Sequence, residues 1–258
     1  MVGINTSMSG LPVEWEKRIK KHIPFTYIVD KNGRGTHGTI QDALDHSFSA
    51  QQATSNVYNI PSGIYIRGGE YVETLISKAF GLLIQGEGVA TKIICPDSDN
   101  TTVFEIKGAY TTVRDLAVYS TPGEGKTGNL VHDNTQGGNA YFNVRIYGSD
   151  GGGFQCNVGQ TWNNCWALSC DVDGFDFYGD SYHIVNCTAG SNGGWGFDLA
   201  GNADNSTIVG CGGYSNTSGD CQIQSVAENC VVVGNRFNST TTITDSSGTS
   251  TVASNDLT

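Results

Sequence analysis

The second half of the chain repeats one arrangement of apolar and polar positions. Each unit opens with Asn or Gly followed by an apolar or Cys residue, and successive openings are 21, 22, 24 and 19 residues apart. Eleven residues into four of the units, two apolar or Cys residues flank one polar residue, an alternation that indicates a short strand with one buried face. The openings are Asn143-Val144, Asn164-Cys165, Asn186-Cys187, Gly210-Cys211 and Asn229-Cys230, and the alternating triplets are Phe154–Cys156, Phe175–Phe177, Phe197–Leu199 and Cys221–Ile223.

Units this short predict the coils of a β-solenoid, because the tetratricopeptide and ankyrin repeats need about 33 residues or more. Stacked coils lie about 4.8 Å apart, so equivalent residues form ladders along the solenoid. Apolar ladders fill the bore, while Asn and Gly suit the corners, where the backbone turns through left-handed conformations. The predicted fold class is therefore all-β, a single-stranded parallel β-helix.

The eight Cys residues are expected to be buried rather than bridged. The sequence contains no C-x-x-C pair, which argues against zinc, and the chain is long for a disulfide scaffold. Cys packs in a core as a small apolar residue. The expected bore stack is Cys165, Cys187, Cys211 and Cys230, and the expected small polar ladder is Ser149, Cys170, Asn192, Asn216 and Asn235.

The first half follows the same scheme with less regularity. Strands are expected at 82–84, 92–94, 103–106 and 113–116, and residues 120–128 are expected to leave the coil as a loop.

An amphipathic helix near 38–50 is expected to cover the N-terminal end of the solenoid, because an open coil end exposes the bore. We expect residues 1–24 to form a helical extension, with a helix around 13–23, and residues 25–258 to form the β-helix. The Ser/Thr-rich tail after Asn238 is either a thin last coil or a frayed end. Apolar residues recur at helical spacing in the capping helix at Ile40, Ala43, Leu44 and Phe48.

The N-terminal part of the chain resembles the beginning of the pectate-lyase-like right-handed parallel β-helix proteins. The resemblance rests on YIVDKNGRGTHGTIQDALDHS, NIPSGIYIRGGEYVETLIS and GLLIQGEGVATKII, which together span Tyr27 to Ile94. In that superfamily a Thr-Ile-Gln-x-Ala-Leu helix caps the solenoid, and Pro-x-Gly-x-Tyr and Ile-x-Gly-Glu-Gly turns follow. The resemblance implies a right-handed β-helix with an N-terminal α-helical cap. It leaves the function open, because the superfamily includes lyases, hydrolases, esterases, epimerases, and phage tailspike and attachment proteins.

The catalytic signatures of the superfamily are absent or incomplete. The polygalacturonase motifs and the Asp-Pro-His of mannuronan epimerases are missing. Pectin methylesterases carry Gln-Asp-Thr-Leu on one coil and Asp-Phe-Ile-Phe-Gly on the next. Here 155–158 and 176–179 are only superficially similar, with Cys156 in place of the general-acid Asp. A carbohydrate esterase is therefore a third and more distant interpretation.

Polar residues between the apolar pairs should point outward, because neighbouring strand residues face opposite sides. This predicts an outward ladder of Gln155, Asp176, Asp198 and Gln222, extended by Glu105 through a rung at either 131 or 132. Two carboxylates one rung apart raise each other's proton affinity, which suits a general acid and its carboxylate partner. The predicted catalytic pair is Asp176 and Asp198, and the predicted substrate-binding residues are Gln155, Gln222, Trp195, Tyr178 and Trp166.

Two other interpretations of these carboxylates stay open. Outward Asp residues are common on any solenoid, so the pair could be solvated and without a role. No cofactor is required for acid–base chemistry, but Asp171, Asp173 and Asp176 lie close in sequence and could bind Ca²⁺, although the full calcium-loop pattern is missing. His183 on the same coil is interpreted as structural rather than as a ligand.

The charge distribution restricts the classes of partner that the protein is expected to bind. The formal net charge is −11, and after Ile146 Arg236 is the only cation. An acidic surface disfavours nucleic acid and anionic membranes, and no apolar run is long enough to cross a bilayer. Because cations are scarce, a calcium-free lyase acting on a strongly acidic glycan is disfavoured, and a neutral or mixed glycan fits better.

Two hypotheses about function follow. In the first, an extracellular or virion-associated β-helix protein recognises a surface polysaccharide through its acidic and Gln ladder, with cleavage left open. In the second, the protein is a non-catalytic structural or attachment protein that forms a homotrimer. Both hypotheses place the protein outside the cell, on a cell surface or on a virion. No signal peptide is visible, and many virion proteins are made without one.

Overall fold

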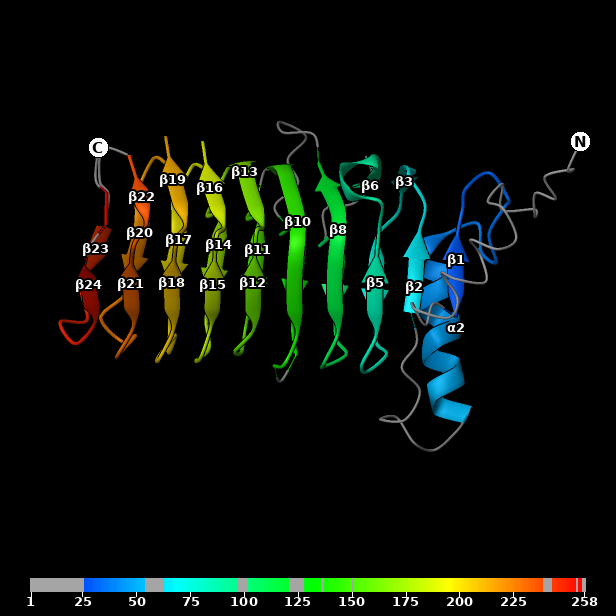
Figure 1. Cartoon of the computed structure of the whole chain (residues 1–258), viewed down its shortest axis with the longest axis horizontal. Coiled ribbons are helices and arrows are strands. Elements are labelled where there is room, and N and C mark those ends of the chain that lie inside the picture. The colour runs from blue at the N-terminus through cyan, green and yellow to red at the C-terminus, as the bar shows by residue number, and fades with distance from the viewer. Residues whose placement is uncertain are drawn as a thin grey trace, which may run out of the picture.

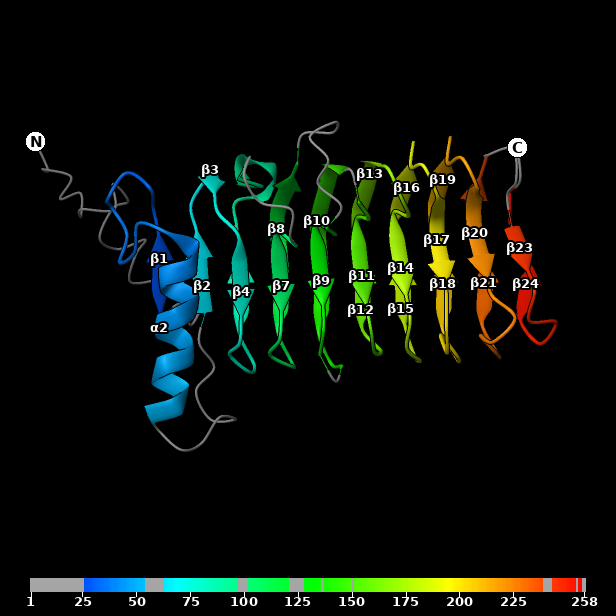
Figure 2. The same ribbon diagram turned by 180° about the vertical axis from the view of Figure 1, so that it is seen from behind.

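The computed structural model describes residues 26–53, 63–96, 102–120, 128–135, 137–149, 151–238, 243–253 and 255–256. Its strands stack side by side along one long axis, with helix α2 at the N-terminal end and β23 and β24 at the other end (Figures 1 and 2). Every strand pairing among the described residues is parallel, and neighbours in space are one coil apart in sequence. This architecture confirms the predicted all-β parallel solenoid.

Each regular coil contributes strands to three rows. The eight-stranded sheet is one of them (Figure 2). The 16-stranded sheet forms the other two, which we call the main row and the side row; β8 and β10 are long enough to run from one into the other (Figure 1).

The described elements have the following bounds. The eight-stranded sheet contains β4 Leu75–Ser77, β7 Phe104–Ile106, β9 Val131–Asp133, β11 Phe154–Cys156, β14 Phe175–Phe177, β17 Trp195–Leu199, β20 Gly219–Ile223 and β23 Ile243–Asp245. The main row contains β1 Tyr27–Val29, β2 Gly63–Ile66, β5 Leu83–Gln85, β8 Thr112–Tyr119, β10 Ala140–Ser149, β12 Thr161–Asn163, β15 His183–Val185, β18 Thr207–Val209, β21 Val231–Val233 and β24 Thr251–Ala253. The side row contains β3 Gly69–Val72, β6 Thr91–Ile94, β13 Trp166–Cys170, β16 Thr188–Gly190, β19 Gly212–Tyr214 and β22 Arg236–Phe237, and the helical elements are α2 Ile40–Ala53 and the 3-10 turn η1 Gly88–Ala90.

The bore is filled by the apolar residues of the alternating triplets. Phe154, Phe175 and Phe197 occupy successive rungs and stack with ring centroids 4.9 and 5.0 Å apart. All three are completely buried. Burying a Phe side chain contributes about 1.5–3 kcal/mol, so these ladders supply much of the stability of the fold.

One corner of the coil is made by residues in the left-handed region. Asn164, Asn186 and Gly210 have φ angles of 55°, 54° and 65°, and each precedes a Cys of the predicted stack. The amide of Cys165 donates to Sγ of Cys187 at 3.4 Å, and the amide of Cys187 donates to Sγ of Cys211 at 3.3 Å. All eight Cys are free and buried, as the sequence predicts.

The predicted position of Cys230 in this stack is wrong, and so is that of Asn235 in the polar ladder. The amide of Cys211 donates to Oδ1 of Asn235 at 2.8 Å, so Asn235 continues the Cys165–Cys211 stack. Cys230 instead follows Ser206, on the rung that precedes Val231. The smaller polar ladder runs from Cys170 to Asn192 and Asn216 through bonds of 3.0 and 3.1 Å.

Helix α2 closes the N-terminal end of the bore. Ile40, Ala43 and Leu44 are buried in the core, as predicted, while Phe48 packs against it and is partly exposed. The side chain of Gln41 accepts from the amide of Ile76 at 2.8 Å and donates to its carbonyl at 3.3 Å. These bonds satisfy backbone groups on the edge strand β4, which would otherwise lack a partner strand.

The remaining sequence predictions fall partly outside the described residues. The first-half strands are present as β5, β6, β7 and β8. The expected helix at 13–23, the extension 1–24 and most of the loop 120–128 lie outside the described residues. After Asn238, β23 and β24 add a last, largely exposed coil. Within the described part, no helix has the length and apolarity needed to span a membrane.

Candidate functional site

The predicted outward ladder follows the middle positions of the eight-stranded sheet. Asp176 pairs in register with Gln155 on one side and Asp198 on the other, and Gln222 follows Asp198. The coil that the sequence left ambiguous is settled by the register, which places His132 between Glu105 and Gln155. The complete ladder is Ile76, Glu105, His132, Gln155, Asp176, Asp198, Gln222 and Thr244.

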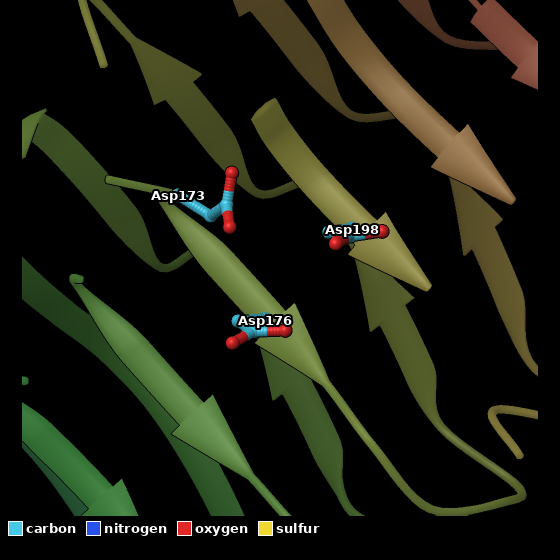
Figure 3. Close-up of side chains that lie close together, drawn as sticks. All are labelled: Asp173, Asp176 and Asp198. Atoms are coloured by element: carbon cyan, nitrogen blue, oxygen red, sulfur yellow. The ribbon is translucent and has the colours of Figure 1, made fainter. Parts of the chain in front are cut away.

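A third carboxylate joins the predicted pair. Asp173, Asp176 and Asp198 each offer an oxygen atom, and these oxygens all lie within 4.8 Å of one another (Figure 3). Asp173 precedes β14, and its Oδ1 accepts a short hydrogen bond from the backbone amide of Trp195. Asp171 is exposed and is not part of this group, so the acidic cluster differs from the Asp171, Asp173 and Asp176 set considered for calcium.

The three carboxyl groups hold their protons more tightly than free carboxyl groups do. Burial raises the pKa of Asp176 to about 6, with a further contribution from the charge of Asp173. Burial also raises the pKa of Asp198 to about 7, helped by the charges of Asp173 and Asp176. The pKa of Asp173 is raised by burial, which its bond from the Trp195 amide partly opposes. Near neutral pH the ladder therefore combines a protonated and an ionised carboxyl group on adjacent rungs.

Amide side chains hold the two ladder carboxylates in place. Gln155 donates from Nε2 to Oδ2 of Asp176 at 3.4 Å, and Asn129 fixes Gln155 by donating to its Oε1 at 2.6 Å. Gln224 donates from Nε2 to both oxygens of Asp198, at 3.0 and 3.3 Å. Among the described residues, Oδ1 of Asp176 is buried and lacks a hydrogen-bond partner.

Of the predicted aromatic residues, Tyr178 and Trp195 lie at the cluster. Tyr178 is exposed and lies close to Asp176; burial and then the charge of Asp176 raise its pKa to about 12. Trp195 opens β17 and contributes its backbone amide to Asp173. The structure does not bring Trp166 to this site, because Trp166 belongs to β13 in the side row.

Gln222 occupies the rung beyond Asp198, and His183 lies exposed on β15 in the main row. The sequence interpretation missed Gln224 and Asn129 altogether, and it considered Asp173 only for calcium. Gln224 lies two residues beyond Gln222, so the period-2 rule that placed the ladder could have indicated its outward position. Asn129 precedes β9, where the sequence left the register open.

Comparison with known proteins yields structural neighbours only. No family model and no curated protein sequence matches the chain. Pectin methylesterase from carrot superposes with a TM-score of 0.54 at 15% identity over 86% of this chain, which spans 64% of the carrot enzyme. Pectin methylesterase PemA from Erwinia chrysanthemi gives 0.61 at 13% identity, covering 86% of this chain and 80% of PemA. The A-module of mannuronan C-5 epimerase AlgE4 from Azotobacter vinelandii gives 0.50 at 15% identity, covering 82% and 75%.

At sequence identities this low, the structural similarity shows the fold and leaves the activity open. The chain covers most of PemA and of the AlgE4 module, so the likeness extends over the solenoid and not over one motif. The protein therefore has the right-handed parallel β-helix fold of the pectate-lyase-like proteins.

Proposed function

We propose that this protein binds a polysaccharide along the outward ladder of the eight-stranded sheet and hydrolyses a glycosidic bond at Asp176 and Asp198. The observation that carries the proposal is the pair of pKa values, about 6 and about 7, on carboxyl groups one rung apart. General acid–base catalysis works best with groups that titrate near the working pH. Solvated surface carboxylates would titrate near 4 instead.

The two carboxyl groups would have different roles. Asp198 is the more buried and has the higher pKa, so it is the general acid that donates a proton to the leaving glycosidic oxygen. Asp176 is ionised at a lower pH and attacks the anomeric carbon; water then releases the sugar, with Asp198 acting as the base. Carboxyl groups about 5–5.5 Å apart are typical of retaining enzymes, and the oxygens here lie within 4.8 Å. The anomeric configuration should therefore be retained.

The surroundings of the pair favour a neutral or mixed glycan. Asp173 adds a third carboxylate, which would stabilise positive charge on the sugar ring but repel a uronate at the same place. The exposed ring of Tyr178 lies beside Asp176 and can stack on a sugar. An extracellular or virion location belongs to this proposal, since such polysaccharides lie outside the cell. A homotrimer in solution would instead favour the attachment protein.

A second candidate is a carbohydrate esterase, favoured by one contact. The amide of Gln155 already donates to Asp176, and the same N–H group could stabilise the oxyanion formed when a carboxylate attacks an ester. The neighbours named pectin methylesterase share the fold of this chain. For an esterase, Asp176 would attack the ester carbonyl and Asp198 would protonate the leaving alcohol. Water, deprotonated by Asp198, would then hydrolyse the acyl group from Asp176.

The test is incubation with a panel of neutral, mixed and esterified polysaccharides. New reducing ends indicate hydrolysis, released methanol or acetate indicates esterase activity, and binding without either product supports the attachment protein. Hydrolysis should fall about 10²–10⁴-fold in Asp198→Asn and in Asp176→Asn. Asp171→Asn is the matched control, because Asp171 is an exposed acid of the same segment outside the cluster. If both cluster variants retained wild-type activity, the proposed site would be wrong.

A further inference from the structure

The side row of the large sheet presents aromatic rings and a cation to solvent. The rings of Tyr119 and Tyr147 stack with centroids 4.9 Å apart and an interplanar angle of 14°. Beside them, the guanidinium carbon of Arg145 lies 4.4 Å from the centroid of the Trp166 ring. All four side chains are partly exposed. Trp166, which the sequence predicts as a substrate-binding residue beside the acidic ladder, belongs to this cluster instead.

The strand register makes these two pairs a continuous surface. Tyr119 is paired with Tyr147, and Arg145 with Trp166, so each pair spans two neighbouring strands. Arg145 and Tyr147 are two residues apart on β10 and therefore point to the same side, about 7 Å apart. The result is a continuous group of aromatic side chains over β8, β10 and β13, which lie next to one another in Figure 1. Tyr119 and Tyr147 pack face to face in it, so their edges face solvent. We call Tyr119, Arg145, Tyr147 and Trp166 the aromatic platform.

A further ring lengthens the same side of the sheet. Tyr214 lies on β19, and its ring covers Gly190 on β16, where an added Cβ would meet the Tyr214 Cζ at 2.3 Å. Leu168 lies between Tyr147 and Gly190 in the ladder. The outward row therefore continues from the stacked tyrosines through Leu168 to a ring that lies over a glycine.

Arg145 differs from several other cations because no carboxylate of the described residues pairs with it. Lys92, Lys107 and Arg114 each lie within 3.0 Å of a carboxylate oxygen. Within the described ranges, no carboxylate lies within 4.0 Å of Arg145, and its Nε is buried and unbonded. A half-buried charge without a partner is unfavourable. In a chain with a net charge of −11, an unpaired guanidinium stacked on Trp indicates a place for an external anion.

We propose that the aromatic platform binds an acidic polysaccharide, with sugar rings packed against the exposed edges of Tyr119 and Tyr147 and against Trp166, and a uronate carboxylate on Arg145. Arginine suits this role because its planar fork of donors matches a carboxylate while its face rests on an aromatic ring. The platform lies on a different sheet from the Asp173, Asp176 and Asp198 cluster. It therefore holds anionic sugars where the acidic ladder would repel them, and the binding does not depend on hydrolysis.

The electrostatics around Tyr119 agree with this assignment. Burial and the neighbouring Tyr147 raise the pKa of Tyr119, while the charges of Lys92 and Arg145 oppose the rise. Lys92 also lies 5.9 Å from the centre of the Tyr119 ring, although Glu70 neutralises it. The platform is thus a local positive region on an acidic protein, which suits isolated carboxylates better than the dense charge of nucleic acid.

The experiment measures calorimetric binding of hexagalacturonate to the Asp176→Asn/Asp198→Asn double variant. This background removes the residues of the proposed hydrolysis, so the outcome is independent of whether the protein is a hydrolase. Hexagalacturonate should bind, and its fully methyl-esterified form should bind at least tenfold more weakly because it lacks the carboxylates. Adding Arg145→Gln or Trp166→Ala should weaken hexagalacturonate binding about tenfold or more.

Arg236→Gln is the matched control. Arg236 stands three rungs beyond Trp166 in the same ladder, is exposed, and has no ring stacked against it among the described residues. Its loss should leave the affinity within twofold of the parent. Circular dichroism and thermal melts would show that each variant is folded, and Arg145→Lys should bind with intermediate affinity. The proposal is overturned if hexagalacturonate does not bind, if the esterified form binds equally well, or if Arg145→Gln and Arg236→Gln have equal effects. Self-association through this face that hexagalacturonate does not compete with would also overturn it.

Discussion

The eight-stranded sheet and the side row enclose the same bore but present different chemistry to solvent. On the former, outward positions carry Gln155, Asp176 and Asp198. On the latter they carry Tyr147, Trp166 and Arg145, and no described carboxylate pairs with Arg145. Before the last coil, the inward positions of both rows are buried and mostly apolar, with Ser77 and Asp133 among the polar exceptions. A solenoid of this kind separates stability from chemistry, because inward residues hold the coils together while each outward face can change independently.

The largest predicted difference between the eight-stranded sheet and the side row is in the rate of hydrolysis. We expect Asp198→Asn to lower the rate about 10²–10⁴-fold, because it removes the proton donor with a pKa near 7. Arg145→Gln should leave hydrolysis of a neutral oligosaccharide unchanged, since Arg145 lies on another sheet. Rate measurements on the two variants with one neutral substrate test both statements. Equal losses would mean that the two faces form one site.

The next largest predicted effect is a loss of stability caused by a substitution in the bore that both faces share. Phe175→Ala should lower the free energy of unfolding by about 3–5 kcal/mol, because Phe175 is completely buried between two stacked rings. Chemical denaturation followed by circular dichroism measures this change. Hydrolysis and hexagalacturonate binding should then be lost at the same reduced temperature. Loss of one function well before the other would show that the faces unfold separately.

Much of this comparison follows from the sequence, because alternation with a period of two determines which residues point inward. The bore residues Phe154, Phe175 and Phe197 and the outward Asp176 and Asp198 are predicted correctly for this reason. Alternation does not say which row a strand joins. Trp166 is therefore near Asp176 in sequence and on a different sheet in space.

Corner residues explain why the sequence analysis placed Cys230 and Asn235 in the wrong ladders. Asn229 and Gly234 both have left-handed φ angles, of 56° and 66°, and both residue types favour that conformation. Gly234, and not Asn229, continues the corner formed by Asn186 and Gly210. The sequence offers two equivalent candidates, and only the pairing of Gly212 with Arg236 distinguishes them.

The acidic face alone should make stability depend on pH. Asp176 and Asp198 have folded-state pKa values of about 6 and about 7, above the ordinary value near 4. The folded state therefore retains protons that the unfolded chain has released, so stability should fall as pH rises from about 4 to about 7 and then level off. At about 1.4 kcal/mol for each pKa unit, the two shifts together correspond to a decrease of at most about 7 kcal/mol.

The Asp176→Asn/Asp198→Asn double variant should lose most of this decrease and be more stable than the wild type at pH 8. Arg145→Gln should keep the wild-type slope, because the aromatic platform contains no carboxylate. Unfolding by urea at pH 4, 6 and 8 measures the slopes. A wild-type stability that rose over this range would contradict the raised pKa values.

The smallest effect concerns the far end of the aromatic row. Gly190→Ala places a methyl group where the Tyr214 ring now lies, 2.3 Å from its Cζ. Because the obstacle is the end of a flexible side chain, the ring should move away while the fold is retained, with a change in stability of less than about 1 kcal/mol. Hexagalacturonate binding should weaken by a small factor, about threefold, if its chain extends from Tyr147 to Tyr214.

Gly212→Ala is the matched control, because Gly212 lies in the same row on β19 and an added Cβ there meets its nearest neighbours only at 3.9 Å. Its binding should equal that of the wild type. A similar loss in the two variants would show that the change acts on the sheet and not on the ring. Unchanged binding in Gly190→Ala would confine the glycan to Tyr119, Tyr147 and Trp166. Titration with a shorter oligomer, trigalacturonate, distinguishes these outcomes further, since a trimer that covers only the stacked tyrosines and Trp166 should not respond to Gly190→Ala at all.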